Sequence, residues 1–109
     1  MAKKPETTFK EYVADELATL PNLWCTKVQQ VAIRGIPDIM GIVNSFPFVW
    51  ELKKDAKEKA SALQLYNLRR AKKAGGISRL VYPENFDECF AELKHFSELR
   101  LKLQRPLPR

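Results

Sequence analysis

The stretch from residue 46 to residue 82 constrains the fold of this chain more than any other part of its sequence. It begins with an apolar, strand-like run over residues 46–53, passes through a charged loop, and continues as a helix-like run that stops at Gly75-Gly76. A second strand-like run then covers residues 77–82. A strand, a helix and a strand in this order form a crossover that pairs the two strands in parallel. The chain is therefore expected to build a sheet with a helix packed on it.

Further helix-like and strand-like segments lie on either side of this crossover. Apolar residues recur at helical spacing over residues 5–20, which predicts a helix. Runs rich in β-branched and aromatic residues predict strands over 23–31 and 38–43, and the Asn-Ser dipeptide at 44–45 predicts a hairpin turn. From residue 84 onward, phenylalanines and leucines at helical spacing predict a last helix.

These segments give the order α-β-β-β-α-β-α and predict an α/β fold, in which helices flank a small mixed sheet. At 109 residues the chain has room for one domain, because two domains of half this length would each be too small to bury a stable core. We therefore expect a single domain over residues 1–109. Its core should lie between about residues 5 and 96, with a basic C-terminal tail over residues 97–109.

Composition excludes several classes of protein. Hydrophobic residues make up 45% and charged residues 29% of the chain, as in folded globular proteins and unlike disordered ones. The sequence has neither an apolar run long enough to span a membrane nor the apolar segment of a secretory signal near its start. Cys25 and Cys89 lie far apart, which fits reduced thiols better than a disulfide framework or a zinc site. We therefore expect a cytoplasmic protein that does not bind membranes.

Positive charge is concentrated in one part of the chain. The net charge is +6 at pH 7, and the window from residue 53 to residue 73 accounts for all of it. Such a field attracts a polyanion such as nucleic acid. A lysine-rich helix face that is merely solvated would give the same pattern, so charge by itself leaves both interpretations open.

Two short segments carry the residues best suited to chemistry, the RGIPD segment at 34–38 and the ELK segment at 51–53. Side chains alternate along a strand, so Glu51 and Lys53 share a face, with Cα atoms roughly 6.5 Å apart. Neighbouring strands lie about 4.8 Å apart, which lets Asp38 come alongside Glu51. Adjacent carboxylates repel each other, and a hard cation such as Mg²⁺ relieves that repulsion. The backbone carbonyl of Leu52 is a candidate for a third oxygen ligand.

This arrangement suits metal-dependent hydrolysis of a phosphodiester. A lysine beside the metal can orient the attacking water and offset the charge that develops on the phosphorane. The spacing alone is unspecific, because the same letters recur at residues 92–94 in a helical segment, where positions two apart face different directions. On spacing alone, Glu51 and Lys53 fit equally well as a salt bridge on the polar face of an edge strand.

Two further motifs follow in order, the SALQ segment at 61–64 and the AGG segment at 74–76. Together the four motifs resemble the VRR-NUC (virus-type replication-repair nuclease) branch of the PD-(D/E)xK nuclease superfamily, over about residues 5 to 82. The resemblance implies a restriction-endonuclease-like core, dependence on Mg²⁺ or Mn²⁺, and DNA as substrate. Stand-alone members of this size resemble phage proteins that act in the host cytoplasm. Some of their relatives form homodimers that cut branched DNA such as Holliday junctions.

The resemblance also implies roles for individual residues. Asp38 and Glu51 match the metal ligands of the family, and Lys53 matches its catalytic lysine. Gln64 matches a glutamine on the following helix that lies near the active site and contacts the lysine or the phosphate. These four residues, together with an acid on the first helix, form the expected catalytic set.

Three glutamates on the first helix are candidates for that acid. Glu6 falls in line with the apolar stripe and would point toward the sheet, whereas Glu11 lies on the solvent side and Glu16 comes late in the helix. We expect Glu6 to serve the site as a catalytic residue and metal ligand, although an acid at a helix start is also favoured by the helix dipole alone. The chain departs from the family in having Lys10 where many members carry a glutamine.

Six basic residues are expected to contact DNA phosphates, unless they are simply solvated charges: Lys27, Arg34, Lys54, Lys57, Lys59 and Arg69. The sequence thus predicts a metal-dependent DNA endonuclease that is selective for branched DNA and acts as a homodimer. The C-terminal helix, with Leu99, Leu101 and Leu103, is one candidate dimer interface. Two other functions remain open, a catalytically silent DNA-binding module and a phage protein that binds a host factor.

Overall fold

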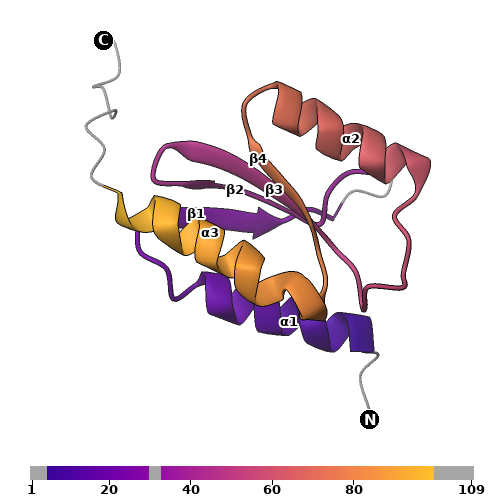
Figure 1. Cartoon of the computed structure of the whole chain (residues 1–109), viewed down its shortest axis with the longest axis horizontal. Coiled ribbons are helices and arrows are strands. Elements are labelled where there is room, and N and C mark those ends of the chain that lie inside the picture. The colour runs from indigo at the N-terminus through magenta and orange to yellow at the C-terminus, as the bar shows by residue number, and fades with distance from the viewer. Residues whose placement is uncertain (1–4, 30–32, 100–109) are drawn as a thin grey trace.

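The computed structural model describes residues 5–29 and 33–99, with side chains from Thr8 onward. Figure 1 shows a single sheet with helices on both of its faces. The elements are α1 (Pro5–Leu17), β1 (Leu23–Lys27), β2 (Ile39–Val43), β3 (Phe46–Leu52), α2 (Ala62–Lys73), β4 (Ile77–Val81), the short 3-10 helix η1 (Pro83–Asn85) and α3 (Phe86–Glu98). The predicted α-β-β-β-α-β-α order and the mixed α/β class are confirmed.

The four strands lie in the order β1-β2-β3-β4. The first two pairings are antiparallel, and β3 pairs with β4 in parallel, as the crossover predicts. Asn44 and Ser45 form the β2–β3 turn with φ values of 48° and 80°, and this left-handed backbone matches the twist of a hairpin. Ile39 faces Trp50 in the register of that hairpin, so Asp38, one step further, comes level with the β3 residue after Trp50.

The core lies between the sheet and the layer formed by α1 and α3 (Figure 1). Alternate residues of β3 point into it: Phe48, Trp50 and Leu52. The predicted apolar stripe of α1 is buried there too: Phe9, Val13 and Leu17. The ring of Phe86, at the start of α3, meets the rings of Phe9 and Trp50 edge-on, each at a centroid distance of 6.2 Å. Phe86 therefore joins α1, β3 and α3 in one aromatic cluster.

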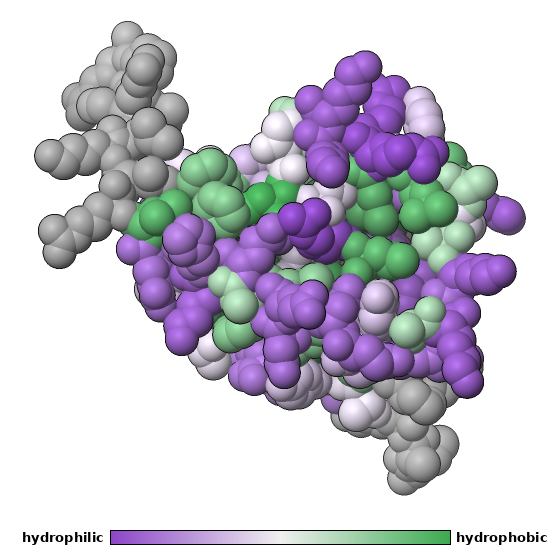
Figure 2. All heavy atoms as spheres, in the orientation of Figure 1, coloured by the Kyte–Doolittle hydropathy of each residue, from purple (hydrophilic) through white to green (hydrophobic). Residues whose placement is uncertain are grey.

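Helix α2 packs over β3 and β4 on the opposite face of the sheet (Figure 1). It begins with a capping box, in which the Ser61 Oγ accepts a hydrogen bond from the Gln64 backbone N–H and the Gln64 side chain accepts one from the Ser61 N–H. After the helix, Gly75 has a φ of +103°, a conformation that stops a helix, as predicted. Hydrophilic side chains cover the outer sides of both helical layers, and hydrophobic ones show between them (Figure 2).

Several boundaries differ from those predicted. β1 ends at Lys27 rather than at residue 31, because its partner β2 begins only at Ile39 and one further bond, from the Val28 N–H to the Asp38 carbonyl, closes the pairing. α1 ends at Leu17 rather than at residue 20, because the backbone N–H groups of Thr19 and Leu20 bond three rather than four positions back. α3 ends at Glu98, and residues 100–109, which carry the rest of the candidate dimer helix, lie outside the described residues. No helix among the described residues is long and apolar enough to cross a membrane.

Candidate active site

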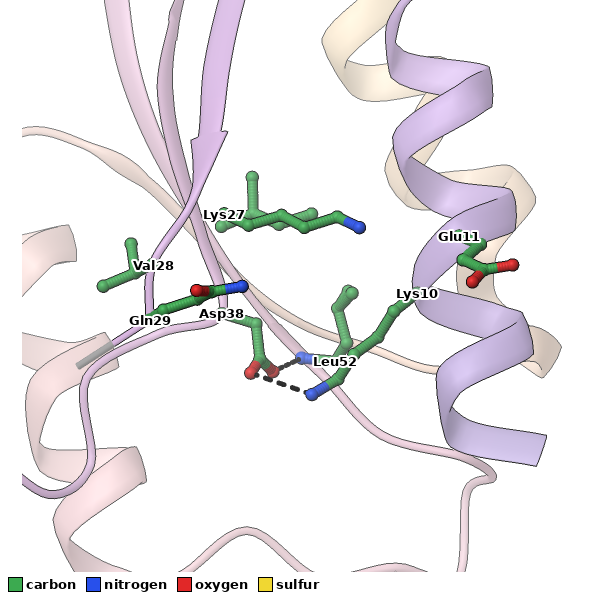
Figure 3. Close-up of a pocket in the computed structure, with 8 residues that line it drawn as sticks. Lys10, Glu11, Lys27, Val28, Gln29, Asp38 and Leu52 are labelled. Atoms are coloured by element: carbon green, nitrogen blue, oxygen red, sulfur yellow. Dashed lines mark hydrogen bonds and ion pairs between the residues drawn. The ribbon is translucent and has the colours of Figure 1, made fainter. Parts of the chain in front are cut away.

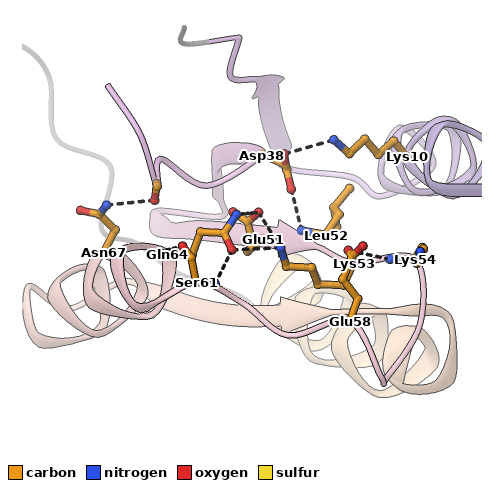
Figure 4. A network of polar contacts seen from close by, with 11 residues as sticks. Lys10, Asp38, Glu51, Leu52, Lys53, Lys54, Glu58, Ser61, Gln64 and Asn67 are labelled. Carbon is orange, nitrogen blue, oxygen red and sulfur yellow. Dashed lines mark hydrogen bonds and ion pairs between the residues drawn. The ribbon is translucent and has the colours of Figure 1, made fainter. Parts of the chain in front are cut away.

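A cluster of polar side chains lies where β2 begins and β3 ends, beside the first turn of α2 (Figure 4). Asp38 directly precedes β2, Glu51 lies within β3, Lys53 directly follows β3, and Gln64 lies in α2. The structure therefore brings together the four predicted site residues whose side chains it describes. Glu6 lies in α1, but its side chain is outside the described part of the chain.

Gln64 joins Glu51 and Lys53, whose side chains both turn away from the core. Its Oε1 accepts a hydrogen bond of 2.9 Å from Lys53 Nζ, and its Nε2 donates one of 3.0 Å to Glu51 Oε1. Lys53 Nζ also lies 3.9 Å from that same glutamate oxygen. The Gln64 side chain also accepts the capping-box hydrogen bond from the Ser61 N–H. The start of α2 therefore fixes the Gln64 amide, and this amide in turn positions Glu51 and Lys53. The SALQ motif could have revealed this, since Ser-x-x-Gln is a capping-box sequence.

Asp38 is held by two donors that sequence reasoning did not assign to it. Its Oδ2 accepts a hydrogen bond of 2.8 Å from the Leu52 backbone N–H, and its Oδ1 lies 3.3 Å from Lys10 Nζ (Figures 3 and 4). Leu52 thus contacts Asp38 through its backbone N–H. The proposed metal contact of its backbone carbonyl remains a prediction. The departure from the family at position 10 was the one sequence signal that pointed to Lys10.

Glu51 is buried at a high electrostatic cost. Only 3% of the residue is exposed, and burial raises the pKa of its carboxyl to about 8. The nearby negative charge of Asp38 contributes to this rise, while the positive charges of Lys53 and Lys10 oppose it. Lys53 offsets the cost only in part, because its amine stands 3.9 Å from Glu51 Oε1. Glu51 Oε2 is buried without a hydrogen-bond partner among the described residues.

These features fit a site for a hard divalent cation. Buried oxygens that lack a donor are expensive in a protein interior, and a cation with oxygen ligands would satisfy the free Glu51 oxygen and the adjacent Asp38. The described residues contain no group of three or more acidic, histidine or cysteine side chains that could hold a metal ion together. Two carboxylates are therefore the described side-chain ligands, which leaves room for backbone carbonyl, water and phosphate oxygens, as is usual for Mg²⁺.

A cavity of about 210 Å³ opens between α1 and the ends of β1 and β2 (Figure 3). Asp38 and Lys10 lie on one part of its wall, and Lys27 and Gln29 lie on another. Glu11, which was expected on the solvent side of the helix, is half-buried and lines this cavity as well. The cavity thus gives solvent and small anions a route to the side of Asp38 that Lys10 contacts.

The predicted DNA-contact residues all have exposed side chains: Lys27, Arg34, Lys54, Lys57, Lys59 and Arg69. The loop that carries Arg34 is anchored to α2, because Asn67 Nδ2 donates a hydrogen bond of 2.9 Å to the Gly35 carbonyl. Gly35 has a φ of +79°, and a Cβ at this position would lie 2.6 Å from the Leu63 Cγ. Both the turn and the close approach to α2 therefore require glycine here.

The fold and the cluster define a class of protein, a small mixed α/β domain that gathers two carboxylates, a lysine and a glutamine at one end of its sheet. Among solved structures, a chain described as "VRR_NUC domain" matches this one with a TM-score of 0.70 and 22% sequence identity. The match covers 83% of this chain and 97% of that chain. No protein-family model and no curated protein matches the sequence. The protein thus has the fold of a VRR_NUC domain, as the resemblance of its motifs implied.

Proposed function

We propose that this protein is a metal-dependent DNA endonuclease that hydrolyses phosphodiester bonds. The observation that carries the proposal is the buried, unpartnered oxygen of Glu51 beside Asp38 and Lys53. A structural salt bridge would pair that carboxylate fully, whereas a catalytic site keeps it ready for a cation. The VRR_NUC fold supports the same function.

Asp38 and Glu51 are the residues that would hold Mg²⁺ or Mn²⁺, with the Leu52 carbonyl and Glu6 as further proposed ligands. When bound, the cation supplies Lewis-acid activation of water and of the scissile phosphate. Gln64 binds one oxygen of Glu51, which leaves Oε2 available to a cation.

Lys53 serves the transition state in this proposal. Its side chain is only 10% exposed, and Gln64 orients its amine beside Glu51. An ammonium held in a poorly hydrated site stabilises the negative charge that develops on the phosphorane more strongly than it would in water. Gln64 acts through Lys53 and Glu51, so we assign it a positioning role, with contact to the phosphate as a further proposal.

The exposed basic residues would bind the DNA backbone without reading its sequence. Reversing the charges of Lys57 and Lys59, in the loop between β3 and α2, should weaken DNA binding several-fold and reduce its salt dependence. The metal affinity should be retained, because neither residue is one of the proposed metal ligands and both side chains are exposed. Fluorescence anisotropy over a series of salt concentrations measures the change, and unchanged affinity at low salt would exclude phosphate contacts.

The test of activity is cleavage of labelled DNA at increasing Mg²⁺ concentration, by the wild type and by Glu51→Ala. A panel of four-way junctions, flaps, forks and linear duplexes tests the proposed preference for branched DNA. We expect metal-dependent cleavage by the wild type that is lost in the variant. Equal cleavage by both proteins, or binding without cleavage by the wild type, would contradict the proposal, and the second result would indicate a silent DNA-binding module.

We also propose that the protein acts as a homodimer, because two sites related by a two-fold axis can address two strands of a junction. An apolar patch on the β1–β2 half of the sheet supports a partner: Trp24, Met40 and Ile42 share one face and are 63%, 47% and 49% exposed. Contiguous patches of this kind usually mark an interaction surface. Light scattering should find a dimer that Trp24→Lys disrupts, whereas Tyr66→Lys, on α2, leaves it intact. A wild-type monomer would contradict the proposal.

A further inference from the structure

The two oxygens of Asp38 are held by donors of different mobility. Oδ2 is bound by the backbone N–H of Leu52, which is part of β3 and cannot leave without disturbing the sheet. Oδ1 faces the amine of Lys10, which reaches over from α1 on a flexible side chain that is 34% exposed. A cation that binds Asp38 on its accessible side must therefore share or take the oxygen that Lys10 contacts.

Lys10 and a divalent cation would repel each other at this oxygen. An ammonium 3.3 Å from Oδ1 already neutralises much of the charge that would attract the metal. The influence of Lys10 extends to the second proposed ligand, since its positive charge also acts on Glu51. Removing the charge of Lys10 should therefore make the DNA-free protein bind a cation more tightly. This is the opposite of the usual expectation that a lysine near a nuclease site assists catalysis.

The cavity beside Asp38 also offers Lys10 a place to contact a phosphate. It has room for a phosphate group, and Lys27 and Gln29 add donors on its other wall (Figure 3). A DNA phosphate that shares the cation with Asp38 would lie within reach of the Lys10 amine. The Lys10 ammonium would then leave Asp38 Oδ1 for a phosphate oxygen and would still be paired with a negative charge. The cation could take Oδ1 in its place.

We propose that Lys10 is a positioning residue that couples metal binding to DNA binding: it occupies Asp38 Oδ1 in the free protein and moves to a phosphate of the bound DNA. The inference rests on the proposed function, because it takes Asp38 as a metal ligand and DNA as the substrate. Its consequence is that the free protein binds divalent cations weakly and the DNA complex binds them more strongly. Such coupling is reciprocal, so the cation strengthens DNA binding by the same factor.

The first experiment measures Mn²⁺ binding to the DNA-free protein by calorimetry. Lys10→Met keeps the length of the side chain and removes its charge, and it should bind Mn²⁺ about tenfold more tightly than the wild type. Lys27→Met is the matched control, because it removes a charge from the other wall of the same cavity and should change the affinity less than about twofold. Lys10→Arg keeps the charge and should bind Mn²⁺ as weakly as the wild type.

The second experiment measures binding of a four-way junction by fluorescence anisotropy, with Ca²⁺ or with EDTA. Ca²⁺ uses oxygen ligands as Mg²⁺ does. The wild type and Lys10→Arg should bind the junction about tenfold more tightly with Ca²⁺. In Lys10→Met this ratio should fall to about twofold, because its cation site is available before DNA arrives and its phosphate contact is missing.

The outcomes separate this inference from the proposed function. If the wild type cleaves DNA with Mg²⁺ but Lys10→Met binds Mn²⁺ no more tightly, the coupling is overturned and the nuclease function stands. If Lys10→Met and Lys27→Met tighten Mn²⁺ binding equally, the effect is one of general charge, and the specific role of Lys10 is again overturned. If no variant binds Mn²⁺ and the wild type does not cleave, both proposals fail.

Discussion

The two faces of β3 bury different kinds of side chain, apolar ones on one face and charged ones on the other. Trp50 and Leu52 point into the aromatic and aliphatic core, where they are 0% and 2% exposed. Glu51 and Lys53 point the other way and are almost as deeply buried, at 3% and 8%. Burial favours the first pair, because apolar surface leaves water, and it opposes the second pair, because charge leaves water.

This difference shows that successive residues along one strand have different roles. Those on the core face stabilise the fold, and those on the polar face form the proposed active site. The core face holds the strand rigidly, and the rigid strand then keeps a destabilised carboxylate in a fixed position on its other face. A change on the core face should therefore reduce stability, while a change on the polar face should reduce activity with little loss of stability. The predictions below test this separation, from the largest effect to the smallest.

Lys53→Ala should have the largest effect on activity, a fall in cleavage rate of about 10³-fold, which corresponds to roughly 4 kcal/mol of transition-state stabilisation. Mn²⁺ binding should remain largely intact, because Asp38 and Glu51 are untouched. Single-turnover cleavage and calorimetry measure the two quantities. Gln64→Ala is the companion variant, and an intermediate loss is expected because Lys53 keeps its charge but loses its positioning partner. If Lys53→Ala failed to fold, the conclusion that the polar face contributes to activity rather than to stability would be wrong.

Phe86→Ala should have the largest effect on stability, a loss of about 3–5 kcal/mol in the free energy of unfolding. The ring joins α1, β3 and α3 on the core face, and its removal leaves a cavity among them. Phe86→Leu, which fills more of that space, should cost clearly less. Urea unfolding followed by tryptophan fluorescence measures both. Equal losses in the two variants would show that the apolar volume that leucine restores does not stabilise this site, so that the aromatic ring itself is required.

The pH dependence of stability should come largely from Glu51 on the polar face. Burial and then the charge of Asp38 raise the pKa of Glu51 from 4.5 to about 8. The folded protein therefore holds this proton more tightly than the unfolded chain, so in EDTA the free energy of unfolding should fall as the pH rises from about 4.5 to about 8. Glu51→Gln cannot ionise and should lack this fall.

Urea titrations of the wild type and of Glu51→Gln at several pH values across that range provide the measurement. Titrating groups far from Glu51 contribute equally to both proteins, so the difference between the two curves isolates Glu51 together with its interaction with Asp38. Parallel curves would mean that the carboxylate is ionised throughout the range, with the two faces of β3 less different than we conclude.

Gly35→Ala should have a smaller effect, a loss of about 1–3 kcal/mol, through the loop that anchors Asp38 to the polar face. The substitution adds backbone strain at a φ of +79° and a clash with Leu63 of α2. Gly75→Ala is the matched control, because its φ is +103° and a Cβ there would meet nothing within 4 Å. The excess loss in Gly35→Ala measures the contact with α2 by thermal unfolding. Equal losses would assign the whole effect to backbone strain.

Local sequence patterns by themselves determined the elements and most of the candidate site. Strand alternation placed Trp50 in the core and paired Glu51 with Lys53 on the other face, because the period of a strand depends only on its own backbone. The apolar stripe of α1 and the glycine stop after α2 were likewise readable from spacing. The resemblance of the motifs pointed to the VRR_NUC fold that the structure confirms.

Only the tertiary structure decided which groups from distant segments meet. Lys10 reaches Asp38 across 28 positions because α1 packs against the end of the β2–β3 hairpin, and no local pattern encodes that packing. The Leu52 N–H binds Asp38 because of the hairpin register, and β1 stops where its partner stops. Such contacts depend on how whole elements pack and align, which is a property of the complete chain, whereas helix and strand periods are properties of short segments.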